Sequence, residues 1–321
     1  MTLRTTRRAA GGLALAVLAG QARAQDRQPL RLIVPQPPGG AADGIGRILA
    51  DSMARELGQP VIVDNRPGAN GVIAVNALKA ARGFDAVLLG GVSLFSFNPN
   101  LYSNLPYDSA RDFTYIAPVV DTTLVLVANP RVGVTTLAAL MERARAEPER
   151  LTYASVGIGN STHLSMEMIT DTAGVRMTHI PFNGTTPSLT SVMQGQTDCM
   201  VIPLVSALPH IQAGSLVALA ILNPQRVSGL PNVPTLRETG FEGLAMPGWY
   251  AIVGPAGMSA TTVERLNAAV RAATADSENV RRFREVYLEP MSGSAEFVRR
   301  AVETDSAAWG AFIRRKNLRV E

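Results

Sequence analysis

Two glycine-rich turns carry the residues of this chain that could do chemistry. The first is PQPPGGAAD at 35–43, and the second is ASVGIGNSTH at 154–163. Each turn follows an apolar strand-like run and precedes a helix-like run, so the unpaired N–H groups that begin the helix point beyond the turn. Neither turn contains Lys or Arg, so backbone amides would hold an anion there. This chemistry favours a small carboxylate, clamped between the two turns, over a triphosphate.

Several polar side chains near these turns have more than one interpretation. His163 and Glu167 have the i, i+4 spacing of metal ligands on a helix, but no third ligand accompanies them, so we predict no metal site. His163 is expected to cap the pocket or to hydrogen-bond the loop. Asp43 is either a helix N-cap or a ligand contact, and Asp198 has the same two interpretations.

Interpretations of the chain as an enzyme fail on the details of the motifs. A strand, a glycine turn, a helix and then Asp64 are typical of a dinucleotide site, but GIGNST at 157–162 lacks the third glycine of that motif. A serine hydrolase would need a G-x-S-x-G elbow, which is absent from the sequence. We therefore predict a protein without catalytic residues and without a cofactor.

The first 24 residues are typical of a secretory signal peptide. Several arginines precede the apolar run GGLALAVLAG, and an A-x-A site at Ala22–Ala24 predicts cleavage before Gln25. General secretion and twin-arginine export both remain open. Cleavage would leave 26 Lys and Arg against 26 Asp and Glu, so a neutral protein is expected in the periplasm, with no electrostatic case for nucleic acid. Cys199, which has no second cysteine to pair with, is interpreted as a buried apolar residue.

Strand-like and helix-like runs alternate along most of the chain. This alternation predicts an α/β protein with mostly parallel sheets and helices on both faces. The expected strands are 30–34, 61–63, 86–89, 151–155, 178–182, 198–203, 216–222 and 249–253, and the main helices fall near 45–57, 71–81, 135–146, 164–168, 259–275 and 294–316. Thr135 is expected to cap the helix over 135–146.

The run over 115–128 is too long for one ordinary strand and is expected to cross between two domains. The strand at 249–253 would return to the first domain. We therefore expect a signal peptide at 1–24, lobe 1 formed by residues 25–123 and 248–321, and lobe 2 formed by residues 124–247. A ligand cleft would lie between the lobes, which would close by a hinge through the two crossings.

The order of several motifs resembles a known family. These motifs are PQPPGGAAD, DNRPGANG at 64–71, NPNLY at 98–102, LPYDSARDF at 105–113, LTYASVGIGNSTHL, HIPFNGTTPSLTSVMQGQTD and LPNVPTLRETGF. Together they resemble the receptors of tripartite tricarboxylate transporters, also called Bug proteins. The resemblance implies a two-lobed periplasmic-binding-protein fold of type II and a monomer that delivers a small carboxylate to a two-component membrane permease. A sensor that signals through a membrane partner remains the alternative.

The resemblance also implies a set of ligand-binding residues. They are Pro38, Gly39, Gly40, Ala41, Ala42, Asp43, Asn98, Ser155, Gly157, Gly159, Asn160, Ser161, Thr162, His163, Phe182, Gly184, Thr185 and Asp198. The chain departs from the family pattern at Gln36, where an aromatic residue is usual, and at Ala42, where a hydroxyl residue is usual. Pocket turns without cations favour mono- or dicarboxylates, while nearby aromatic residues would suit an aryl acid: Phe95, Phe97, Phe182 and Trp249.

Overall fold

The strands of the protein form two separate sheets. The computed structural model describes residues 28–81, 85–241, 246 and 248–320, so the expected signal peptide lies outside the described residues. The first sheet has the order β11-β4-β10-β3-β1-β2 and consists of β1 (Leu30–Val34), β2 (Val61–Asn65), β3 (Ala86–Gly91), β4 (Phe113–Thr122), β10 (Tyr250–Pro255) and β11 (Leu288–Pro290). The second has the order β7-β6-β8-β5-β9 and consists of β5 (Leu124–Ala128), β6 (Thr152–Ser155), β7 (Thr178–Pro181), β8 (Cys199–Pro203) and β9 (Val217–Ile221).

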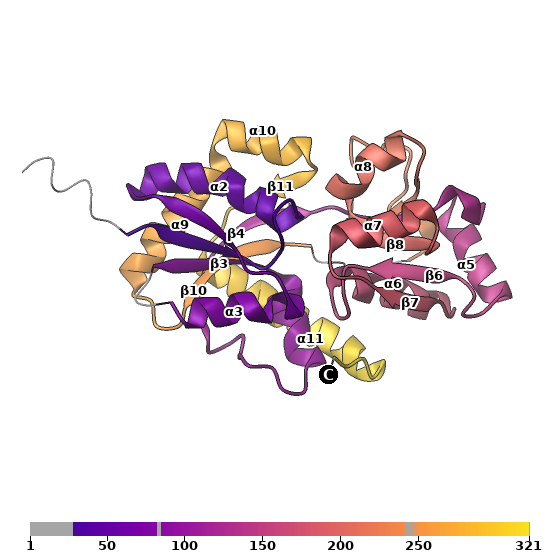
Figure 1. Cartoon of the computed structure of the whole chain (residues 1–321), viewed down its shortest axis with the longest axis horizontal. Helices are drawn as coiled ribbons and strands as arrows, with labels where there is room; N and C mark the ends of the chain where they lie inside the picture. Colours follow the sequence, from indigo (N-terminus) through magenta and orange to yellow (C-terminus); the bar gives the residue numbers. More distant parts are fainter. Residues whose placement is uncertain (1–27, 82–84, 242–245, 247, 321) are drawn as a thin grey trace, which may run out of the picture.

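Helices flank both sheets, and Figure 1 shows the two groups of elements side by side. The first group contains α2 (Ala41–Leu57), α3 (Val72–Lys79), α9 (Ala260–Ala275), α10 (Ser277–Glu285) and α11 (Ala295–Arg315). The second contains α5 (Leu137–Ala146), α6 (Ser161–Ala173), α7 (Thr185–Gln194) and α8 (Leu204–Gln212). The short helices are η1 (Ala69–Gly71), η2 (Ser93–Phe97), α4 (Asn98–Leu101), η3 (Pro130–Val132) and η4 (Arg237–Thr239). Within the described ranges, no helix is long and apolar enough to cross a membrane.

Both sheets are mixed, which corrects the prediction that they are mostly parallel. Strand β1 pairs in parallel with β2 and β3, and β6 pairs in parallel with β7 and β8. Strand β10 is antiparallel to β3 and β4, and β5 is antiparallel to β8 and β9. The reason is that β5 and β10 each arrive from the other sheet. They begin at the edge where the parallel strands of their own sheet end, so they run the opposite way.

The predicted crossing over 115–128 is two strands, one in each sheet. Strand β4 ends at Thr122 and β5 begins at Leu124. The Thr122 hydroxyl donates to the carbonyl of Gly248 at 2.5 Å, and the Asn223 side chain accepts the N–H of Leu124 at 3.1 Å. The crossing from β4 to β5 is therefore hydrogen-bonded to both ends of the segment that returns from β9 to β10, at Asn223 and at Gly248.

Side-chain caps mark the start of α5, α6, α9, α10 and α11, and the cap of α5 corrects a prediction. Helix α5 begins after Thr136, whose side chain accepts the N–H of Ala139 at 3.1 Å, so the cap is Thr136 and not the predicted Thr135. Helix α10 and strand β11 were not predicted. The α10 sequence SENVRRFRE is mostly charged, and it buries only Asn279 and Phe283, so it carries little apolar periodicity. Cys199 is fully buried, as predicted.

Candidate functional site

The first glycine turn, between β1 and α2, is closed by its own side chains. Gly39 has φ of +80°, a conformation that favours glycine, and its N–H donates to the Asp43 carboxylate at 2.9 Å. The Gln36 side-chain oxygen accepts the N–H of Ala42 at 3.0 Å. The side-chain amide of Gln36 donates to the hydroxyl of Tyr250 at 3.3 Å. The N–H of Gly40 donates to the carbonyl of Pro37 at 3.1 Å, so three backbone amides at this turn are already bonded within the protein.

Asp43 has a structural role at this turn. It is 3% exposed and accepts hydrogen bonds from Arg47 at 2.9 Å and from Asn65 at 3.0 Å, besides the one from Gly39. Burial raises the pKa of Asp43, but the hydrogen bonds from Arg47, Gly39 and Asn65 outweigh it and hold this pKa below its usual range. Gly40 is the N-cap residue of α2, so Asp43 is not its cap. The carboxylate locks the turn to α2 and to the end of β2.

The second glycine turn, between β6 and α6, is also bonded internally. The N–H of Gly157 donates to the Ser155 hydroxyl at 3.2 Å, and the N–H of Gly159 donates to Nδ1 of His163 at 3.1 Å. The Thr162 hydroxyl accepts the N–H of Val156 at 3.0 Å. The amides of both glycines, which the sequence suggested for a ligand, thus serve to fix the turn. The prediction that His163 hydrogen-bonds the loop is confirmed.

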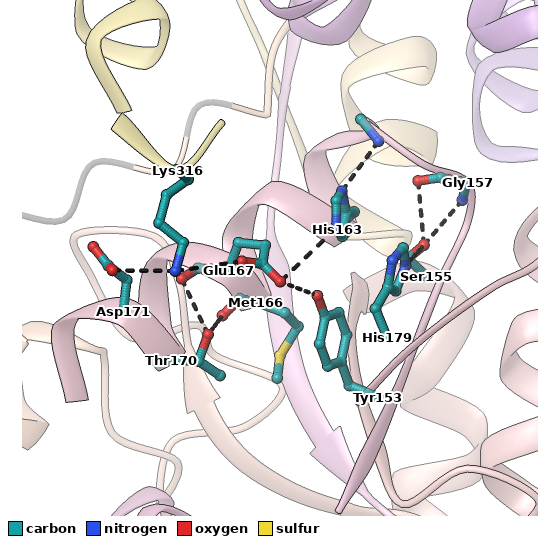
Figure 2. Close-up of polar contacts among 11 residues, drawn as sticks. Tyr153, Ser155, Gly157, His163, Met166, Glu167, Thr170, Asp171, His179 and Lys316 are labelled. Atoms are coloured by element: carbon teal, nitrogen blue, oxygen red, sulfur yellow. Dashed lines mark hydrogen bonds and ion pairs between the residues drawn. The ribbon is translucent and has the colours of Figure 1, made fainter. Parts of the chain in front are cut away.

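A stack of three rings supports this second turn (Figure 2). The ring of His163 stacks on His179 with centroids 3.9 Å apart, and His179 stacks on Tyr153 at 4.8 Å. Nε2 of His179 lies 2.7 Å from the Ser155 hydroxyl. His179 therefore contacts both of the side chains that accept the glycine amides, Ser155 and His163.

Lowering the pH is expected to destabilise the protein through this stack. Burial lowers the pKa of His163 from 6.5 to about 4, and burial together with His163 lowers the pKa of His179 to about 3. The unfolded chain takes up these protons at a higher pH than the folded protein does. The contribution of the two neutral histidines to the free energy of unfolding is therefore fully present above about pH 6.5 and decreases as the pH falls towards about 4. The shift at His163 corresponds to about 3 kcal/mol.

Urea unfolding at about pH 7.5 and about pH 5 measures this decrease. His163→Gln is expected to show a smaller decrease than the unsubstituted protein, because one of the two titrating groups is gone. Equal pH dependence in the two proteins would contradict the buried neutral state of His163.

The two turns lie at facing edges of the two sheets. The carboxyl ends of parallel strands meet at one edge, so the segments that follow β1 and β3 lie at one edge of the first sheet, and those that follow β6 and β7 lie at one edge of the second. The N–H of Ser161 at the start of α6 donates to the hydroxyl of Ser93, which follows β3, at 3.1 Å. A Cβ at Gly159 would lie 2.5 Å from Cδ1 of Leu101, in the segment after β3. The second turn therefore contacts the first group of elements.

Some amides at these edges remain open. Ala41 begins α2 and Thr185 begins α7, and no acceptor in the described part of the chain takes either N–H. The N–H of Phe182 donates to the carbonyl of Ser155 at 3.0 Å, which holds the start of the α7 turn beside the second glycine turn. Gly184, with φ of +115°, is the N-cap residue of α7. The open donors at these edges therefore include the helix-start amides of α2 and α7.

Asn98 and Asp198 do not join the other predicted residues as free ligand contacts. Asn98 is fully buried, and its side chain bonds to Asn70 and to Tyr107. Asp198 accepts the N–H and the hydroxyl of Thr152 at 2.8 and 2.9 Å. Thr152 begins β6, whereas the glycine turn follows the other end of that strand. Asp198 thus lies at the opposite edge of the second sheet, and the prediction that it contacts a ligand is corrected.

The aromatic residues proposed for an aryl acid are mostly core residues. Phe95 is fully buried, packs edge to face on Phe113 and stacks on Trp249, and Phe97 packs on Trp309 with centroids 4.9 Å apart. Only Phe182 of that set is partly exposed. Three of the four aromatic residues suggested for an aryl acid, Phe95, Phe97 and Trp249, are therefore core residues.

Sequence reasoning missed several residues that shape the site. Ser93 connects the two groups of elements by accepting the N–H of Ser161. Gln36 accepts the N–H of Ala42 in α2, and the side chain of Asn65 donates to the carboxylate of Asp43. The glycine pair Gly90–Gly91, which ends β3, was a signal for a third strand-turn unit beside the first. A cavity of about 1530 Å³ lies against α9 and α11, and of the residues suggested for a ligand only Phe95 lines it. The described residues contain no group of three or more His, Cys, Asp and Glu that could hold a metal ion.

Comparisons with known proteins agree on one family. Residues 45–318 match the model of the tripartite tricarboxylate transporter family receptor. Protein BugT of Bordetella pertussis is 30% identical over 289 residues, which cover 89% of each chain. An R. palustris protein solved with adipate superposes with a TM-score of 0.85 at 28% identity, over 90% of this chain and 97% of that one. MatC from Rhodopseudomonas palustris with bound malate gives 0.82 at 26% identity, over 88% and 98%.

These findings confirm the predicted two-lobed α/β fold of periplasmic binding proteins, and the relatives are solute-binding proteins, not enzymes. The chain therefore belongs to the family of tripartite tricarboxylate transporter receptors, the Bug proteins.

Proposed function

We propose that this protein is a periplasmic receptor that captures a small organic carboxylate between two lobes and delivers it to a two-component membrane permease. Lobe 1 would comprise residues 25–123 and 248–321, and lobe 2 residues 124–247, after removal of a signal peptide at 1–24. The observation that carries the proposal is the contact between Ser93 and Ser161, which joins the facing edges where the helix starts of α2, α6 and α7 lie.

Open helix-start amides supply the chemistry for a carboxylate. The amide of Ala41 begins α2 in the first group of elements, and the amide of Thr185 begins α7 in the second. One acid with two charged ends would therefore engage both groups. Each hydrogen bond to a charged group contributes about 1.5 to 3 kcal/mol, and several of them sustain micromolar binding after the cost of association. The glycine turns hold no Lys or Arg, which favours a mono- or dicarboxylate over a tricarboxylate. Adipate and malate, present in the two similar structures, are both dicarboxylates.

A thermal-shift screen tests the ligand class. Adipate and malate are expected to raise the melting temperature, with citrate and benzoate as comparison acids that give smaller shifts. A ligand at a hundredfold excess over its Kd stabilises by about 2.7 kcal/mol. Adipamide, which has the length of adipate but no charge, is the matched control and is expected to give no shift. The proposal fails if none of these acids stabilises the protein or if adipamide does so equally.

Delivery to a permease is tested in the bacterium. Deleting the receptor gene is expected to abolish uptake of the labelled acid identified by the screen, and restoring the gene is expected to restore uptake. Normal uptake combined with lost transcription of ligand-induced genes would instead support the alternative of a sensor that signals through a membrane partner.

A further inference from the structure

Glu167 lies one helical turn after His163 on α6, below the second glycine turn (Figure 2). One of its carboxylate oxygens, Oε1, accepts the hydroxyl of the fully buried Tyr153 at 2.5 Å and lies 3.9 Å from Nε2 of His163. His163 in turn accepts the N–H of Gly159 through Nδ1. The carboxylate and the glycine turn therefore contact opposite sides of the same imidazole ring.

The other oxygen of Glu167 faces a cation from the first group of elements. Nζ of Lys316, directly after α11, lies 3.8 Å from Oε2 of Glu167 and 3.2 Å from the carboxylate of Asp171. Arg315 pairs with the same Asp171 at 2.7 Å. Strand β4 of the first sheet packs against α11, so these ion pairs join α6 to the group that carries the first turn.

We propose that Glu167 is a positioning residue for the second turn and that Lys316 holds Glu167 in place for this role. The ring of His163 can accept the N–H of Gly159 only while Nδ1 carries no proton, which places the proton of the neutral ring on Nε2. A carboxylate near Nε2 favours that tautomer, as acidic partners of histidine do around metal sites. The contacts from Lys316 through Glu167 and His163 to Gly159 thus link α11 to the turn. The importance of this link for ligand binding rests on the proposed function.

Three variants separate this role from simple packing. Glu167→Gln keeps an oxygen that can accept the Tyr153 hydroxyl but removes the charge beside His163. Lys316→Met removes the cation and keeps the aliphatic stem. The matched control is Arg300→Met on α11, because Arg300 pairs at 3.0 Å with Glu296 of the same helix and reaches no residue of α6.

A measurement without ligand decides the link. Nitrogen-15 NMR of the histidine rings is expected to show His163 protonated at Nε2, and amide exchange is expected to show protection of Gly159. In Glu167→Gln the Gly159 amide should exchange roughly tenfold faster, because the tautomer that accepts its hydrogen bond is less populated. Lys316→Met should shift both signals in the same direction by less, and Arg300→Met should change neither. Unchanged His163 and Gly159 signals in Glu167→Gln would overturn the proposal.

Calorimetry with adipate then measures the consequence for binding. Glu167→Gln and Lys316→Met are each expected to weaken adipate binding by about threefold to tenfold, and the double variant should be no weaker than Glu167→Gln alone, because both act through one path. Additive losses would contradict a shared path. Failure of the unsubstituted protein to bind adipate would contradict the proposed ligand, while the NMR measurement would still decide whether Glu167 positions the turn.

Discussion

Gly159→Ala is expected to lower the free energy of unfolding by about 2 to 4 kcal/mol and to abolish carboxylate binding. Gly159 has φ of +76°, where a residue with a Cβ costs about 1 to 2 kcal/mol. The new Cβ would also lie 2.5 Å from Cδ1 of the buried Leu101, so either Leu101 or the turn must move. Such a shift would break the hydrogen bond from Gly159 to His163 and displace the start of α6. Urea unfolding measures the first effect, and calorimetry with the best acid from the screen measures the second.

The matched control for this substitution is Gly174→Ala at the other end of α6. Gly174 has φ of +63°, and a Cβ there would meet no atom within 4 Å. It should therefore lose only the backbone contribution, about 1 to 2 kcal/mol, and should bind ligand normally. Equal losses of stability at Gly159 and Gly174 would show that the contact with Leu101 costs nothing, and the placement of the second turn against the first group would then be wrong.

Asp43→Ala is expected to destabilise the protein by about 3 kcal/mol and to weaken ligand binding strongly. The substitution leaves the N–H of Gly39 without its acceptor and removes the partner of Arg47. It also removes one of the two acceptors of the Asn65 side-chain amide, which keeps its hydrogen bond to the carbonyl of Gln36. Because the first turn is closed by these bonds, the start of α2 should lose its fixed position. Chemical denaturation gives the stability, and amide exchange of Gly39 reports on the turn itself.

Asp51→Ala is the control on the same helix, because Asp51 is exposed on α2. It should change the stability by less than about 0.5 kcal/mol and leave binding unchanged. A folded Asp43→Ala protein with normal stability but no affinity would instead make Asp43 a direct ligand contact, which was the other interpretation open from the sequence.

The hypothesis that backbone amides hold the ligand survives only in a changed form. The sequence pattern pointed to Gly157 and Gly159 as donors, yet in the structure Ser155 and His163 accept these two amides. Proline at Gly159 would therefore damage the turn by removing a structural hydrogen bond and not a ligand contact. His163 hydrogen-bonds the loop, as expected, and in this way helps to build the turn. The open amides of Ala41 and Thr185 are now the proposed donors to the ligand.

Local sequence was enough to predict most of the fold. Apolar runs bounded by Gly, Pro and Asn determined the strands and helices, because burial and capping act over a few residues. The two strand-turn-helix units and the two crossings between sheets were found in this way. Helix α10 was not predicted, because its charged sequence has almost no apolar periodicity.

The tertiary structure alone decided which polar groups are free. Whether an amide at a helix start is open depends on side chains that arrive from elsewhere, such as Ser93 at Ser161, 68 residues away in sequence. The direction of β5 and β10 likewise follows from the edge at which the chain enters each sheet, which no local pattern records. Asp198 shows the same limit, because a strand has two ends and only the pairing with β6 reveals that this residue lies away from the turn. Sequence therefore determined the parts of the site, and long-range contacts determined which of them can meet a ligand.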